Sequence, residues 1–175
     1  MTKQELEMCI DEYGKDIYSF CKHLTNNLQE ADDLYQDTFL TAVEIKEKID
    51  YDNNPKSYLL SIALRIWKNK KRKFAWRKRI ADVRFISDER DAGMGESAEM
   101  SLEERITGKE KDEAIRMAVS RLPDKLKIVV LLFYMEDLST AQIAEAVKIP
   151  AGTVLSRLHQ ARKVLKKELE DVLNG

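Results

Sequence analysis

From Leu138 to Arg162 the chain reads LSTAQIAEAVKIPAGTVLSRLHQAR, and this stretch decides the fold of its C-terminal part. Ser139 and Gln142 have the spacing of a capping box, and Leu138 and Ile143 flank them as a hydrophobic staple. The short helix that they start should end near Val147, where Lys-Ile-Pro turns the chain. A second helix is predicted over residues 151–165. A short capped helix, a tight turn and a longer helix indicate a helix-turn-helix.

The faces of the second helix have different chemistry. Val154, Leu158, Ala161 and Leu165 have the spacing of a buried stripe. Residues 151–167 include five basic residues and no acidic one, which is typical of a helix that binds a polyanion. The second helix of such a motif usually lies in the DNA major groove. The alternative is a solvated helix that packs on a neighbour. The polar candidates are Thr153, Ser156, Arg157, His159, Gln160, Arg162 and Lys163.

A second basic segment precedes it at residues 65–79, with nine cations in fifteen residues. Pro55 suits the first turn of a helix that runs to about Arg79. Cations at i, i+3 and i+7 can follow a phosphate backbone, and aromatic rings can stack on unpaired bases. A membrane-surface helix, a calmodulin-type target and a solvated face are the alternatives. The candidates on this helix are the polar face Arg65, Lys68, Asn69 and Arg72 and the aromatic residues Tyr58, Trp67, Phe74 and Trp76.

The N-terminal part also has the helical period, over residues 6–24 and again after Asn27, a predicted N-cap. The second helix places Asp33, Asp37 and Glu44 opposite its apolar stripe. Carboxylates at i, i+4 could form a metal or acid–base pair, but no histidine or further carboxylate completes such a site. A solvated face and a partner-binding face remain as interpretations of this acidic side. Pro123 should break the helical pattern between residues 113 and 135.

Composition sets the remaining limits. The chain has 175 residues, 30 Lys and Arg against 31 Asp and Glu, and two cysteines. The near-zero net charge hides a strong segregation, because residues 1–60 are acidic and residues 61–84 hold ten basic residues and one acidic one. The sequence predicts an all-α protein of two small domains, 1–84 and 112–175, joined by an acidic flexible linker over 85–111. We expect a reduced, cytoplasmic setting without a signal peptide or membrane span.

The ordered combination of three stretches resembles bacterial RNA polymerase sigma factors of the extracytoplasmic-function type, within the sigma-70 superfamily. EADDLYQDTFL at 30–40 is similar to the family's core-polymerase-binding helix. PKSYLLSIA at 55–63, which runs into the basic segment, resembles the helix that reads and opens the −10 element. Residues 122–162 resemble the −35-binding domain. The resemblance implies a non-catalytic initiation subunit that binds core RNA polymerase and promoter DNA, and an anti-sigma factor, often membrane-bound, as a further partner.

The resemblance also implies roles for particular residues. Residues 49–56 would form the loop that captures a flipped base. The residues implied in core-polymerase binding are Asp32, Asp33, Gln36, Asp37 and Phe39. Those implied at the −10 element are Asn54, Lys56, Tyr58, Arg65, Trp67, Lys68, Asn69 and Arg72. Those implied at the −35 element are Ser139, Thr153, Ser156, Arg157, His159, Gln160, Arg162 and Lys163.

Two other classes of function compete with this interpretation. A free-standing helix-turn-helix regulator would dimerise through residues 1–80 and bind DNA without polymerase. A nucleic-acid-processing enzyme would need a metal or nucleophile cluster, and the sequence contains no such motif. We therefore expect no catalytic residue, no metal, no cofactor and no small-molecule substrate.

Overall fold

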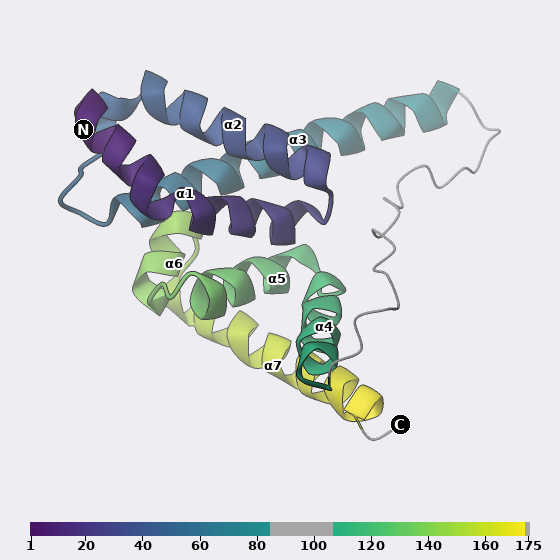
Figure 1. The fold of residues 1–175 in the computed structure, drawn as a ribbon. Coiled ribbons are helices and arrows are strands. Elements are labelled where there is room, and N and C mark those ends of the chain that lie inside the picture. The colour runs from purple at the N-terminus through teal and green to yellow at the C-terminus, as the bar shows by residue number, and fades with distance from the viewer. Residues whose placement is uncertain (85–106, 174–175) are drawn as a thin grey trace.

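The computed structural model describes residues 1–84 and 107–173, and they form helices and turns without a strand (Figure 1). The all-α prediction is confirmed. The predicted linker over 85–111 lies mostly outside the described residues, and its last five residues belong to a helix. The elements are α1 (Lys3–Thr25), α2 (Leu28–Glu44), the 3-10 turn η1 (Lys46–Lys48), α3 (Pro55–Arg84), α4 (Thr107–Ser120), α5 (Asp124–Val130), the π-helical turn η2 (Leu131–Met135), α6 (Thr140–Val147) and α7 (Ala151–Leu173).

Helices α1, α2 and α3 pack on one another and form the first group of helices. Thr2 and Glu5 form a capping box at the start of α1, and Asn26 ends it in the left-handed conformation. Asn27 then accepts a hydrogen bond from the Glu30 amide, as an N-cap of α2 should. The C-terminal half of α3 extends past the ends of α1 and α2 (Figure 1), and residues 69–79 are exposed. The N-terminal half of α3 therefore packs in the core, and its C-terminal half is an exposed basic helix.

The second group consists of α4 to α7, in which α4, α5 and α6 all pack on α7. Pro123 breaks the helical pattern, as predicted, because it cannot continue the preceding helix, and it lies at the N-cap position of α5. The chain then passes through the π turn η2, where the Glu136 amide donates to the Leu131 carbonyl at 3.1 Å. Sequence periodicity did not predict this turn. Its effect is to direct Glu136 inward, where the residue is 2% exposed.

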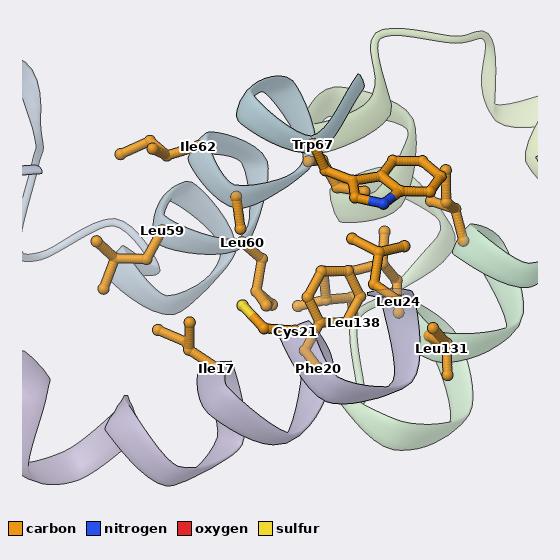
Figure 2. Close-up of a cluster of buried hydrophobic side chains, with 14 of the residues drawn as sticks. Ile17, Phe20, Cys21, Leu24, Leu59, Leu60, Ile62, Trp67, Leu131 and Leu138 are labelled. Atoms are coloured by element: carbon orange, nitrogen blue, oxygen red, sulfur yellow. The ribbon is translucent and has the colours of Figure 1, made fainter. Parts of the chain in front are cut away.

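The two groups share one apolar core. Phe20 and Leu24 of α1 and Trp67 of α3 gather with Leu131 and Leu138 of the second group (Figure 2). Contacts between α3 and α6 and between α1 and η2 continue this packing. No helix among the described residues is both long and apolar enough to cross a membrane.

The capping box of α6 is formed as predicted. Ser139 accepts from the Gln142 amide at 3.1 Å, and the Gln142 side chain accepts from the Ser139 amide at 2.9 Å. Leu138 and Ile143 are both buried beside it.

Replacing Ser139 by alanine should lower the free energy of unfolding by about 0.5–2 kcal/mol, because the Gln142 amide at the start of α6 loses its acceptor. Urea unfolding followed by circular dichroism measures this loss. Ser156→Ala, an exposed serine within α7, is the control and should stay within about 0.5 kcal/mol of wild type. Equal stability of the two variants would contradict a stabilising cap.

Candidate nucleic-acid and polymerase interface

The exposed side of α2 carries acidic and apolar side chains together. Asp33 and Gln36 are exposed, and the Asp37 carboxylate is half-exposed and lies 2.8 Å from the Lys70 ammonium of α3. Asp32 accepts a hydrogen bond from the Tyr18 hydroxyl. Leu40 and Val43, which are 63% and 51% exposed, continue the same stripe. Sequence reasoning missed these two residues, because an apolar residue at a helical period is normally assigned to the core.

Phe39 differs from the other predicted polymerase contacts. It is 9% exposed and belongs to the apolar core, with its ring 4.9 Å from that of Tyr35. The residue therefore fixes α2 against its neighbours, and its ring is not part of the exposed stripe.

Some of the predicted −10 residues line a groove, and others are held by contacts within the protein. Arg65, Lys68, Asn69 and Arg72 line one wall of a groove of about 550 Å³. The rest of its lining comes from the segment 48–54, the first turns of α3 and α6 with Lys148. Burial, and then the positive charges of Arg157 and Arg72, lower the pKa of Lys68. The charge of Arg157 on α7 thus acts on Lys68 on α3. The structure brings the two predicted DNA-binding sets together.

Three predicted −10 residues have structural partners. The Asn54 side chain accepts from the Ser57 amide at 3.1 Å at the start of α3, and its own φ is 47°. The Lys56 ammonium lies 3.0 Å from a Glu136 carboxylate oxygen and 3.3 Å from one of Asp16. Trp67 is 7% exposed and lies in the core (Figure 2). The Lys71 ammonium lies 4.6 Å from the centre of its ring.

Trp67 is therefore not available for base stacking in this structure, contrary to the expectation for it. Its place at the start of the basic segment suggested a nucleic-acid contact, but Trp67 follows the buried stripe of Leu60, Ala63 and Leu64 at helical spacing. The exposed aromatic rings are those of Phe74 and Trp76, at 63% and 62%. Tyr58 is half-buried and lines the groove.

Helix α7 presents the predicted −35 residues on its outer face. Ser156, His159, Gln160, Arg162 and Lys163 are exposed, while Thr153 and Arg157 are half-buried. The Arg162 side chain donates to the Tyr134 hydroxyl at 2.6 Å. The buried stripe of Val154, Leu158 and Ala161 fixes this orientation. Ser139 is not on α7. It lies at the N-cap position of α6, where its hydroxyl accepts from the Gln142 amide.

Leu155 also belongs to this face of α7. It lies beside Ser156 in the first turns of α7 and is 56% exposed. An apolar side chain at this position of a recognition helix suits contact with a thymine methyl group.

Comparison with known proteins gives a consistent result. The family description "Sigma-70 region 2" matches residues 9–78, and "Sigma-70, region 4" matches residues 112–165. The chain is 29% identical to the ECF RNA polymerase sigma factor SigW of Bacillus subtilis, over 93% of this chain and 88% of that one. It is 28% identical to SigV of the same organism, over 96% and 93% of the two chains.

Solved structures show the same fold. The sigma factor RpoE of Bartonella quintana, in complex with the anti-sigma factor NepR, superposes with a TM-score of 0.70 at 22% identity, over 96% of both chains. CnrH, in complex with the cytosolic domain of CnrY, gives 0.65 at 18% identity, over 97% and 90%. The chain thus belongs to the sigma-70 family as an extracytoplasmic-function RNA polymerase sigma factor, a transcription initiation subunit that binds core polymerase and promoter DNA.

Proposed function

We propose a division of this sigma factor's work among three surfaces: the α2 face for core polymerase, the open face of α3 for the −10 element and the outer face of α7 for the −35 element. The observation that carries the proposal is the alignment of Arg65, Lys68, Asn69 and Arg72 along one wall of a groove, opposite the buried side of the same helix. The domains at 1–84 and 112–175 would hold these surfaces at the two promoter elements.

The α2 face supports polymerase docking because it combines charge with exposed apolar area. Large exposed apolar side chains beside acidic groups are typical of a protein–protein contact. The stripe consists of Asp33, Gln36, Asp37, Leu40 and Val43. An acidic face repels DNA, so it suits a protein partner better than the promoter.

The α3 surface supports promoter melting. Its cations can hold the phosphates of a separated strand, and the groove between the segment 48–54 and α3 can receive an extruded base. Extruding a base costs a few kcal/mol of stacking, which such contacts can offset. Phe74 and Trp76 offer exposed rings farther along the same helix.

The α7 surface supports duplex recognition. The N-terminal half of α7 carries Thr153, Ser156 and Arg157, and this is the part of a recognition helix that meets base edges. The cations that follow on α7 suit phosphate contacts, which fix the register of the helix on the duplex.

Regulation and location complete the proposal. RpoE and CnrH were solved with NepR and CnrY, and we infer that this chain also binds an anti-sigma factor. We also infer that the chain acts in the cytoplasm, because polymerase and promoter DNA are there.

Run-off transcription from fragmented genomic DNA tests the proposal, with core polymerase alone as the control. Adding the purified chain should produce transcripts whose 5′ ends share one sequence element about 10 and another about 35 base pairs upstream. Transcripts identical to those from core polymerase alone would overturn it.

Arg157→Ala should weaken promoter binding by the holoenzyme by about 1–3 kcal/mol if the guanidinium reads a base. Fluorescence anisotropy with a duplex that carries the mapped −35 element measures the affinity and its salt dependence. Lys166→Ala, an exposed cation farther along α7, is the control and should affect all sequences equally. Unchanged affinity and salt slope in Arg157→Ala would remove this residue from the interface.

A further inference from the structure

Two aromatic rings of η2 and one guanidinium of α7 form a small cluster on the surface. The rings of Phe133 and Tyr134 pack edge to face, with their centres 4.9 Å apart. The guanidinium carbon of Arg162 lies 5.9 Å from the centre of the Phe133 ring and 5.7 Å from that of the Tyr134 ring. Its Nε also donates to the Tyr134 hydroxyl at 2.6 Å. Two rings and one hydrogen bond therefore hold this guanidinium in place.

The cluster is open to solvent, although residues on both sides of Tyr134 in the sequence are buried. Leu132 and Glu136 point into the protein, whereas Tyr134 is 53% exposed. Arg162 is exposed as well. The π turn therefore presents the Tyr134 hydroxyl at the surface, next to a cation that the rings hold.

The polar groups of this pair have donors left over. A guanidinium carries five N–H donors and no acceptor, and among the described residues Arg162 uses one of them. No described carboxylate forms an ion pair with it. The Tyr134 hydroxyl accepts from Arg162, so its own hydrogen remains to be donated. Both residues thus offer donors at one place, and an anionic oxygen is the partner that suits them.

The position of the pair on α7 identifies the anion. Arg162 follows Leu155 by seven residues, which is about two turns and about 10 Å along the same flank of the helix. The N-terminal part of a recognition helix meets the base edges, and the major groove is about 8.5 Å deep. When Leu155 reaches the bases, Arg162 and Tyr134 are therefore at the level of the sugar–phosphate backbone.

We propose that the Tyr134 hydroxyl and the Arg162 guanidinium form a two-residue clamp on one backbone phosphate of the −35 duplex. The clamp rests on the assignment of α7 to the −35 element, and it adds a residue of η2 to that surface. Arg162 supplies the positive charge, and Tyr134 supplies a neutral donor from outside the recognition helix. A phosphate contact of this kind fixes the register of α7 on the duplex.

Tyr134→Phe tests the clamp, because it removes one hydroxyl and keeps the ring beside Arg162. Anisotropy of a labelled duplex with the mapped −35 element, titrated with holoenzyme, should show binding about three- to tenfold weaker, the loss of one hydrogen bond. The salt dependence should keep its slope, because no charge is lost, whereas Arg162→Ala should reduce the slope by about one. Tyr13→Phe makes the same change at a half-buried tyrosine of α1 and should bind as the wild type does.

Methylphosphonate substitution separates a phosphate contact from a structural role of Tyr134. In each modified duplex a neutral methyl group replaces one charged phosphate oxygen, and the modification is moved along both strands. At one phosphate, the loss of affinity should be smaller in Tyr134→Phe than in the wild type by about threefold or more, because both changes remove the same contact. A structural role would give additive losses at every phosphate.

Wild-type affinity in Tyr134→Phe, or additive losses at every phosphate, would overturn the clamp and leave the assignment of α7 intact. The assignment itself is tested by the wild-type holoenzyme in the same titration. If that holoenzyme bound the −35 duplex no better than a duplex of scrambled sequence, the assignment of α7 would be wrong and the clamp would be wrong with it.

Discussion

Replacing Asp37 by arginine is expected to reduce assembly with core RNA polymerase about 100-fold or more. The substitution reverses a charge in the middle of the α2 stripe and sets a guanidinium against Lys70, the present ion-pair partner of Asp37. Like charges that face each other across an interface cost several kcal/mol. Helical content should stay unchanged, because the Asp37 side chain is 45% exposed and caps no helix.

Asp11→Arg is the matched control for Asp37→Arg. Asp11 is an exposed acid on α1, so the change in net charge is identical. Anisotropy of the labelled chain titrated with core polymerase measures both affinities. Polymerase binding by Asp37→Arg at the strength of Asp11→Arg would remove the α2 face from the proposed docking site.

Phe20→Ala should lower the free energy of unfolding by about 3–5 kcal/mol. The ring is fully buried in the cluster that α1 shares with α3 and the second group (Figure 2). Removing the ring loses the favourable free energy of transferring it from water to the core. It also leaves a cavity that the closely packed helices cannot fill. A small domain has about 5–15 kcal/mol of stability in total, so the loss is a large share.

Phe74→Ala makes the same chemical change at a phenylalanine that is 63% exposed. It should alter the stability by no more than about 0.5 kcal/mol. Urea unfolding of the three proteins gives the comparison. Equal stabilities of Phe20→Ala and Phe74→Ala would contradict the position of Phe20 in the core.

Features that depend on short-range geometry could be predicted from the sequence. Asn27 caps α2, Pro55 begins α3 and Pro123 separates α4 from α5. Ser139 forms its capping box with Gln142. Each of these requirements is set within about four residues of sequence. The apolar stripe of α7 followed from its period and fixed which residues of that helix face outward.

Features that depend on which elements meet in space could not be predicted. Lys127 stands in an apolar run with no sign that its ammonium reaches a carbonyl 103 residues away. Trp67 and Phe74 both lie in the basic segment, yet the first is buried because another helix covers it. The inward turn of Glu136 depends on a π turn, which a 3.6-residue period does not reveal.

The exposed apolar residues of the candidate surfaces illustrate the same limit. Leu40, Val43 and Leu155 lie at helical spacing in the sequence. Only the folded structure shows that their side chains are exposed and that no described residue buries them. A sequence pattern identifies apolar positions well, but it does not separate a core position from a docking position.

The most direct test of the division of labour is permanganate reactivity of unpaired thymines at a promoter mapped by the run-off experiment. Core polymerase with the wild-type chain should make thymines of the −10 element reactive. Core polymerase alone, or with Asp37→Arg, should leave them protected. Protected thymines with the wild-type chain, or equal reactivity with core polymerase alone, would contradict the account.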